Sequence, residues 1–266
     1  MAAVIIGSLL VILSAVFYAT QRQQRHKLTC VQLARSVTVQ DLNTIAQAIH
    51  QDMAQGNWRD YVKVWGTIKA QTPLMSELKQ AECVYYSTKI TQEYEERTYR
   101  TNPKTGGRVS EDRKGSDILV NQQQSIPFQL KDETGTIQID PTGATFDTVE
   151  VLDQFQPGQP GAQRISMGPF SLELPPPSGK RQILGYRYQE SVLPVGRQVL
   201  VVGTVTDETT DLMIRQPTKP GQKLIVSLKS DEVYTAAATK SVKNYKRLMI
   251  GCGVGGAILI VLGLLW

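Results

Sequence analysis

Residues that form disulfides or hold metal ions are scarce in this chain. It contains three cysteines, Cys30, Cys83 and Cys252, and two histidines, and no two cysteines are spaced as C-x-x-C. A disulfide framework uses an even number of cysteines, and a structural zinc site needs four clustered Cys or His ligands. We therefore predict no disulfide framework, which suits a reducing compartment, and no metal site or other cofactor.

Sequence motifs of catalysis are absent as well. Neither H-E-x-x-H nor G-x-S-x-G occurs, and Ser178-Gly179-Lys180 lacks the first glycine of a phosphate loop. The G-x-G-x-x-G pattern from Gly251 to Gly256 lies inside an apolar run, whereas a dinucleotide-binding turn follows a strand. No catalytic or cofactor-binding residue is therefore predicted.

Charged residues are missing from two long stretches, residues 2–20 and residues 248–266. A helix needs about 20 apolar residues to cross the hydrocarbon core of a bilayer. Neither stretch has the polar stripe of a helix packed in a soluble core, so we predict a transmembrane helix at 2–20 and another at 248–266. The alternative for the first stretch is a secretory signal peptide, but no basic residue precedes it and no A-x-A-like cleavage site follows it.

Basic residues border both apolar stretches on the side of the central residues. They are Arg22, Arg25 and Lys27 after the first stretch and Lys240, Lys243, Lys246 and Arg247 before the second. Because Lys and Arg next to a span stay on the cytoplasmic side, both groups place the intervening residues in the cytoplasm. The prediction is a two-pass integral membrane protein whose central domain, residues 28–240, is cytoplasmic.

The net charge of +5 is explained by these same basic residues. They contribute seven positive charges, which leaves a net charge of −2 for the rest of the chain. Such an excess next to a span is attracted to anionic lipid. No RNP motif, zinc finger or basic helix is present. The lipid bilayer is therefore a predicted partner, and nucleic acid is not.

The central residues begin with a helical pattern and continue as strands. Apolar residues recur at helical spacing between Thr38 and Gly56, with Thr38 and Asp41 as a capping box and Gly56 as the terminator. From Tyr61 onward the period is two. The predicted strands cover 61–68, 83–99, 117–129, 126–130, 135–141, 183–190 and 198–205, and a polar hairpin tip covers 102–114. The expected fold class is α+β, a mainly antiparallel β domain with one N-terminal amphipathic helix between two transmembrane helices.

Proline and glycine are concentrated in residues 154–180, which we predict to be a long surface connection between two halves. The halves contain one similar strand each, since Val62–Ile68 and Val199–Val205 share the pattern Val-x-Val-x-Gly-Thr. A small internal duplication is one explanation. A common strand-to-turn pattern is the other.

Small residues recur at four-residue spacing in both predicted spans. They include Ala3 and Gly7 in the first span and Gly251 and Gly255 in the second. Such residues let another helix approach closely, so these four are candidate helix-packing positions and self-association is a candidate role. The alternative is that small residues are merely tolerated in lipid.

Four sequence segments carry a family resemblance. They are Val64-Trp-Gly-Thr-Ile-Lys-Ala-x-x-Pro73-Leu74, Glu82-Cys-Val-Tyr-Tyr86, Ile126-Pro-Phe128 and Leu184-Gly-Tyr-Arg-Tyr-Gln-Glu190-x-x-Leu193-Pro-Val-Gly196. Together with the two-span layout, they resemble the GIDE, or "beside a membrane", domain of two-span RING-type E3 ubiquitin ligases of mitochondrial and chloroplast envelopes. The resemblance extends from Val37 to the second span. In those organelle enzymes the domain faces the intermembrane space, which is the expected location here for an organelle protein.

The resemblance implies a membrane-anchored module that binds protein partners. A RING holds two tetrahedral zinc ions and needs eight Cys or His ligands, and this sequence has three Cys and two His. We therefore expect a relative without a RING, whose function is protein interaction at the membrane. One alternative is a component of an E3 ubiquitin transferase, or of organelle or membrane organisation, with the RING supplied by another protein. A membrane hydrolase with an unrecognised site is a further alternative.

Overall fold

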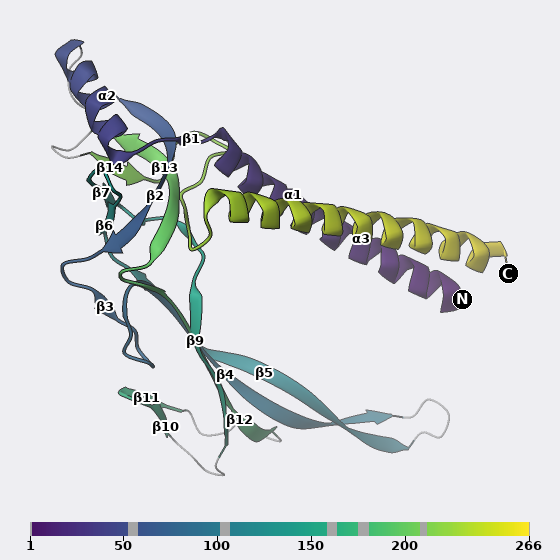
Figure 1. Cartoon of the computed structure of the whole chain (residues 1–266). Coiled ribbons are helices and arrows are strands. Elements are labelled where there is room, and N and C mark those ends of the chain that lie inside the picture. The colour runs from purple at the N-terminus through teal and green to yellow at the C-terminus, as the bar shows by residue number, and fades with distance from the viewer. Residues whose placement is uncertain are drawn as a thin grey trace. The chain divides into compact units, whose positions relative to one another are not determined.

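The computed structural model describes residues 2–52, 58–101, 107–158, 164–174, 181–207 and 212–265. Within these ranges three helices and a mostly antiparallel set of strands form an α+β fold, as the sequence predicts (Figure 1). The chain divides into two compact units. Unit 1 comprises Met1–Thr67, Leu130–Phe146 and Gln198–Trp266, and unit 2 comprises Ile68–Gln129 and Asp147–Arg197.

Unit 1 is built around a small closed sheet. Its strands are β1 (Arg35–Ser36), β2 (Arg59–Lys69), β6 (Phe128–Lys131), β7 (Thr136–Ile139), β8 (Thr145–Phe146), β13 (Gln198–Thr206), β14 (Met213–Arg215) and β15 (Ile225–Ser227). The order is β1-β2-β6-β7-β14-β13-β15-β8, and β2 also pairs with β13. That additional pairing closes β2, β6, β7, β14 and β13 into a barrel, which removes the open edges of those strands.

The two strands with the repeated pattern are neighbours in this barrel. Val64 of β2 lies opposite Val201 of β13, and Gly66 and Gly203 lie opposite Val199 and Val62. A Cβ on Gly66 would lie 2.8 Å from the carbonyl oxygen of Lys131, so glycine is needed where β6 approaches β2. Whether the two strands arose by duplication stays a prediction.

Helix α2 (Val39–Asp52) is the predicted amphipathic helix, and its start is the predicted capping box. The Thr38 backbone N–H donates to Asp41 Oδ2 at 3.0 Å, and the Asp41 N–H donates to Thr38 Oγ1 at 3.2 Å. Leu42 and Ala46 are buried, and Ile45 is half-buried. The predicted terminator, Gly56, lies outside the described residues.

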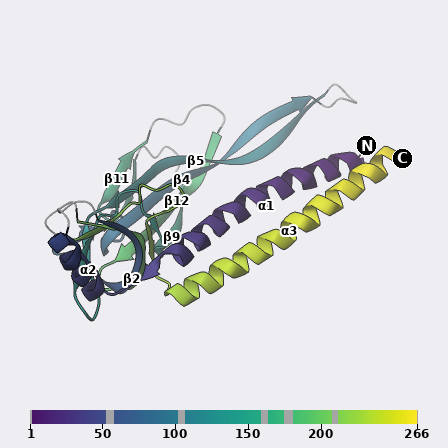
Figure 2. The ribbon, with the colours of Figure 1, turned by 90° about the horizontal axis from the view of Figure 1, so that it is seen from above.

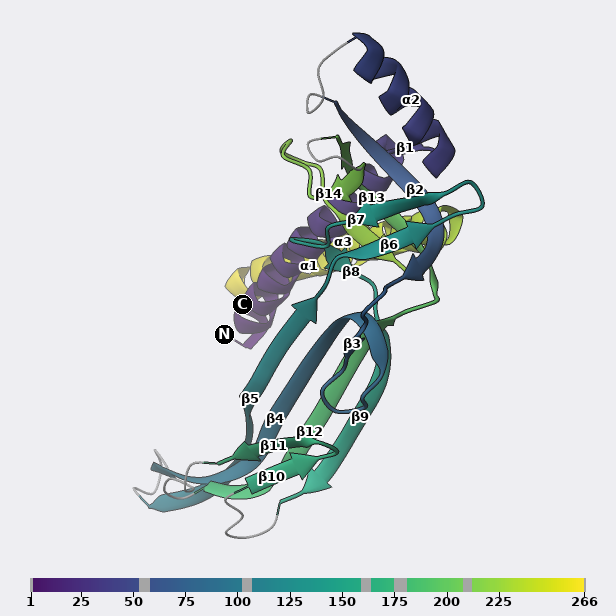
Figure 3. The same cartoon turned by 90° about the vertical axis from the view of Figure 1, so that its left-hand side faces the viewer.

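Unit 2 is a second antiparallel sheet with a two-stranded ribbon (Figure 3). Its strands are β3 (Leu74–Met75), β4 (Glu82–Thr101), β5 (Arg108–Ser125), β9 (Val149–Pro157) and β12 (Arg181–Pro194), and the ribbon is β10 (Arg164–Met167) and β11 (Phe170–Glu173). The central strand β4 pairs with β12 on one side and with β3 and β5 on the other. Ile90 and Tyr188 of the sheet and Ile165 of the ribbon share one buried apolar cluster.

Three strand predictions are corrected by the structure. Within residues 154–180, the described parts are mostly strand rather than surface connection, because β9 ends at Pro157 and β10 and β11 follow, whereas 159–163 and 175–180 lie outside the described residues. Residues 108–114 belong to β5 rather than to a hairpin tip. The predicted strand 117–129 is divided, since β5 ends at Ser125 and β6 begins at Phe128. The physical reasons differ: β9 pairs with the distant strand β12, β10 with its neighbour β11, and residues 108–114 continue the pairing of β5 with β4, whereas Pro127 interrupts the strand between β5 and β6.

Candidate functional site

The two terminal helices form an antiparallel hairpin in unit 1. Helix α1 (Ala2–Leu33) and helix α3 (Asp231–Leu265) run side by side, with the two chain ends together (Figures 1 and 2). The Ser14 hydroxyl of α1 donates a hydrogen bond of 2.9 Å to the Met249 carbonyl of α3. The rings of Phe17 and Tyr245 lie 6.3 Å apart between centroids.

Only one of the described helix-packing candidates lies at this contact. A Cβ on Gly7 would lie 2.8 Å from the Gly256 carbonyl oxygen and 2.7 Å from Ile260, so the helices meet closely there. The Cβ positions of Gly251 and Gly255 have no atom within 4 Å. Ala3 lies in α1, but its side chain is outside the described part. The contact residue on α3 is Gly256. Its sequence signal is that Cys252 and Gly256 are small residues at the same four-residue spacing.

The outer surface of this hairpin is apolar. Val4–Leu33 and Asp231–Gly263 are long and apolar enough to cross a membrane by length and composition, and their most apolar windows are only 11% and 6% buried. Exposed side chains include Ile5, Leu9, Ile12 and Val16 on α1 and Ile250, Val254, Ile258 and Val261 on α3. A core helix of a soluble protein would bury this surface, so the two helices are compatible with a two-pass membrane protein.

The predicted membrane-orienting residues form a basic collar on the same hairpin. The basic collar consists of Arg22, Arg25 and Lys27 on α1 and Lys240, Lys243, Lys246 and Arg247 on α3. Six of these side chains are exposed and that of Lys27 is half-buried. Among the described residues, none of the seven forms a salt bridge, whereas the nearby cations Arg35 and Lys63 pair with Asp60 and Asp231.

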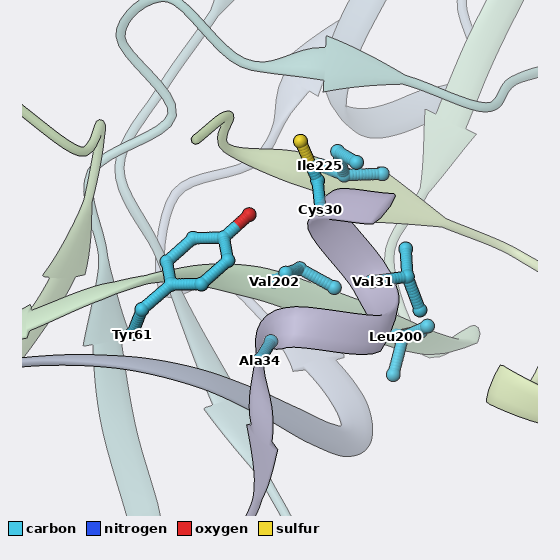
Figure 4. Close-up of a cluster of buried hydrophobic side chains, with 7 residues drawn as sticks. All are labelled: Cys30, Val31, Ala34, Tyr61, Leu200, Val202 and Ile225. Carbon is cyan, nitrogen blue, oxygen red and sulfur yellow. The ribbon is translucent and has the colours of Figure 1, made fainter. Parts of the chain in front are cut away.

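Both helices are fixed to the barrel of unit 1. At the end of α1, Cys30, Val31 and Ala34 pack against Tyr61, Leu200, Val202 and Ile225 (Figure 4). The Cys30 thiol donates to the Gly221 carbonyl at 3.2 Å, and the Tyr61 hydroxyl donates to the Lys223 carbonyl at 2.9 Å. Burial raises the pKa of Tyr61, so its hydroxyl stays protonated as a donor. At the start of α3, Lys63 of β2 binds Asp231 at 2.5 Å.

Unit 2 contains a buried carboxylate that the sequence did not single out. Glu190 of β12 is fully buried and accepts four hydrogen bonds of 2.8 to 3.1 Å. The donors are the hydroxyls of Ser76 and Thr88 and the backbone N–H groups of Leu78 and Lys79. Because every donor belongs to the protein itself, we interpret Glu190 as a clamp on the loop between β3 and β4.

The remaining titratable groups of unit 2 are poorly suited to nucleophilic catalysis. Burial and the negative charge of Glu190 raise the pKa of Cys83 to about 11, so this thiol is protonated at neutral pH. Burial also raises the pKa of Tyr188, whose hydroxyl has no hydrogen-bond partner among the described residues. Within that part of the chain, no three His, Cys, Asp or Glu side chains are grouped to hold a metal ion. The absence of a metal and of catalysis stays a prediction.

A family model described as GIDE, E3 ubiquitin ligase, matches residues 95–263. The chain belongs to the GIDE family. The match covers 169 of the 266 residues, including β5, β12 and β13, and extends into the hairpin helix α3. No curated protein and no solved structure gives a significant match. The GIDE assignment agrees with the resemblance, and the segments 126–128 and 184–196 lie within the match, whereas the segments 64–74 and 82–86 precede it.

Those segments of the GIDE chain have identifiable structural roles. Phe128 and Tyr188 are buried, Glu190 clamps the β3–β4 loop, and Gly196 has a positive φ of 78° at the turn before β13. These roles concern folding rather than ligase chemistry. Since a RING needs eight Cys or His ligands and this sequence has five, these 266 residues alone cannot form one.

Proposed function

We propose that this GIDE chain is a membrane-anchored protein-interaction module that contains no RING within its 266 residues. The observation that carries the proposal is the exposed apolar surface of the α1–α3 hairpin, which water does not accommodate. Both helices belong to unit 1, so the barrel is held beside the bilayer that covers them. The basic collar supports a two-pass topology with the central domain in the cytoplasm, or in the intermembrane space of an organelle envelope.

A strand edge in unit 2 supports the protein-interaction part of the proposal. Strand β5 pairs with β4, and among the described residues no strand pairs with its other edge. Such an edge offers backbone N–H and C=O groups to an extended segment of a partner. Ile118 on β5 is 57% exposed, and alternating charges such as Asp112 and Arg113 protect the edge against aggregation.

Membrane anchoring is tested by extracting native membranes with alkaline carbonate. The chain should remain in the membrane pellet and leave it only with detergent, because two apolar helices hold it there. A reporter fused after Trp266 should be active only on the side opposite to the central domain. Release by carbonate would exclude the anchor, and a reporter active on the same side as the central domain would exclude the two-pass topology.

Partner binding is tested with a photo-crosslinking residue at Ile118, compared with one at the exposed Gln47 of α2. In native membranes Ile118 should give discrete adducts with a protein other than this chain, and an excess of unlabelled chain should reduce them because it competes for the same partner. The Gln47 position should not give the same adducts. Identical adducts from both positions, or none from Ile118, would contradict the use of this edge.

The second candidate, a component of an E3 ubiquitin transferase with a RING supplied by another protein, is favoured by the family match. The purified chain alone should neither bind stoichiometric zinc nor support ubiquitin-chain formation with a charged carrier enzyme, because it lacks the ligands. Chain formation that requires both this protein and a separate RING protein would favour this second candidate. One or two zinc ions per chain would overturn the ligand argument.

A further inference from the structure

We propose that the basic collar binds the phosphate groups of anionic phospholipids in the leaflet nearest the barrel of unit 1. This inference rests on the proposed function, since it requires the α1–α3 hairpin to lie in a bilayer. It goes further by assigning a ligand class to the collar, which would otherwise only orient the chain during insertion.

The positive charge of the collar is not neutralised along either helix. The sequence contains no Asp or Glu before Asp41 and none after Glu232. The two acids of α3 lie in its first turn, and Asp231 is already paired with Lys63. Lys240 comes eight residues after Glu232, which corresponds to roughly 12 Å along the helix axis. The collar therefore presents a concentrated positive potential.

The register of the hairpin brings the two halves of the collar together. Gly7 faces Gly256, and Ser14 bonds to Met249. In an antiparallel pair, each step toward the barrel along α1 is matched by one step back along α3. Arg22 therefore lies level with the turn from Lys240 to Lys243. Two short stretches distant in sequence therefore form one band of cations along the length of the hairpin.

The apolar surroundings of the band determine which anion fits. The same register places Lys246 level with Phe17, and the next residue of α1, Tyr18, has an exposed side chain. Tyrosine rings favour the depth of lipid headgroups, and the long basic side chains next to them reach toward phosphates. Exposed Leu248 follows immediately on α3. A ligand that contacts both the cations and this apolar surface carries an anionic group on hydrocarbon, which describes a phospholipid and not free phosphate.

Arginine adds a geometric preference for phosphate. Arg22, Arg25 and Arg247 carry planar guanidinium groups whose paired N–H donors match two phosphate oxygens. A zwitterionic phospholipid offers the same phosphate but brings a choline cation that these residues repel. The expected preference is therefore for an anionic headgroup over a zwitterionic one.

The test uses the full chain synthesised without cells in an uncharged detergent, so that insertion topology plays no part. Binding of short-chain phosphatidylglycerol, short-chain phosphatidylcholine and inorganic phosphate is measured by calorimetric titration. We expect phosphatidylglycerol to bind at least about tenfold more tightly than phosphatidylcholine, with a preference that weakens as salt rises because the sites are exposed. Inorganic phosphate should bind far more weakly than phosphatidylglycerol.

A charge-matched pair of variants locates the site. Replacing three collar residues, as Lys243→Gln, Lys246→Gln and Arg247→Gln, should reduce the preference to less than about threefold. Replacing three exposed lysines outside the hairpin, as Lys69→Gln, Lys89→Gln and Lys219→Gln, should leave it unchanged. All six positions are exposed, so circular dichroism should show the same helix content in both variants.

The outcomes separate the two proposals. Equal binding of both phospholipids, equally tight binding of inorganic phosphate, or an equal loss in the control variant would each overturn the lipid site. A chain that stays soluble and monodisperse without detergent would instead overturn the membrane anchor on which the site depends. A lipid preference that only the collar variant abolishes would support the inference.

Discussion

The burial of Glu190 can be predicted from the sequence, but its hydrogen-bond partners cannot. Tyr186, Tyr188, Glu190 and Val192 alternate along β12 and are all buried, so period two alone indicates that Glu190 faces inward. A buried carboxylate is costly without compensating donors. The donors come from residues 76–88, more than a hundred residues earlier, and only the fold brings them together.

Replacing Glu190 by Gln should destabilise the protein by about 3–5 kcal/mol, because the donors lose a charged acceptor and the new amide N–H₂ faces them. The matched control is Glu150→Gln on β9, which is exposed and should change stability by less than about 0.5 kcal/mol. Chemical unfolding of the full chain in detergent measures both. Similar losses at the two positions would mean that Glu190 does not hold the loop.

Cys83 should make stability depend on pH above 9. Its pKa is about 11 in the folded protein and 9.0 for the unperturbed thiol, so the unfolded chain loses the proton first as pH rises. The stability associated with the protonated thiol is complete below pH 9 and should decline by about 2–3 kcal/mol between pH 9 and 11. Subtracting the pH profile of Cys83→Ala isolates this contribution. Identical profiles would show that the thiol is not buried as described.

At the scale of elements, the hairpin shows which part of a small-residue pattern is used. Four-residue spacing identified several candidates, yet the contact is made by Gly7 and Gly256, while Gly251 and Gly255 have open space around them. The spacing defines a narrow helix face, but the rotation of each helix is decided by packing and by anchors such as the bond from Ser14 to Met249.

Gly7→Leu and Gly251→Leu should therefore have different effects. The first places a side chain where even a Cβ would lie 2.8 Å from a carbonyl oxygen, so the helices must separate. The hairpin should then unfold at a lower mole fraction of a denaturing detergent. The second enters open space and should leave hairpin stability nearly unchanged. If Gly251→Leu alone shifts the oligomeric state in light scattering, the candidate self-association face is the outward one. Equal destabilisation by both variants would contradict the helix register.

The β9–β11 segment shows why composition misled the sequence interpretation. Pro157 ends an edge strand, where a missing N–H is tolerated, and Gly168 has a positive φ of 57° in the turn between β10 and β11. Both residues are typical of loops, but here Pro157 ends a strand and Gly168 lies in the turn between two short strands. Pairing with β12 and burial of Ile165 and Leu152 in one cluster decided the outcome.

At the scale of the whole molecule, the core of unit 1 includes the end of the apolar helix α1. Cys30, Val31 and Ala34 are 0–4% exposed in the same cluster as Val202 and Ile225. A polar domain cut from the chain at the end of the apolar stretch would keep these residues, and one cut at the start of the capping box would not. The end of α1 is thus part of the core of unit 1.

Fragment 28–235 should therefore be more stable than fragment 38–235 by about 3 kcal/mol, the order expected for exposing the surface that two or three apolar side chains cover. Both should be dominated by β structure in circular dichroism, because most of their described residues are strands. Urea unfolding of the two fragments measures the difference. Equal midpoints would mean that the end of α1 does not contribute to the core.

The sequence by itself determined the features that depend on local pattern and on solvent. Uncharged stretches defined two apolar helices, the Thr38–Asp41 box defined the start of α2, and period two defined the long strands, because each follows from groups near one another along the chain. Tertiary structure decided the closure of the barrel by β2 and β13, the donors around Glu190 and the register of the hairpin. These three features depend on contacts between residues far apart in sequence. Packing of the whole chain decides which of those contacts form.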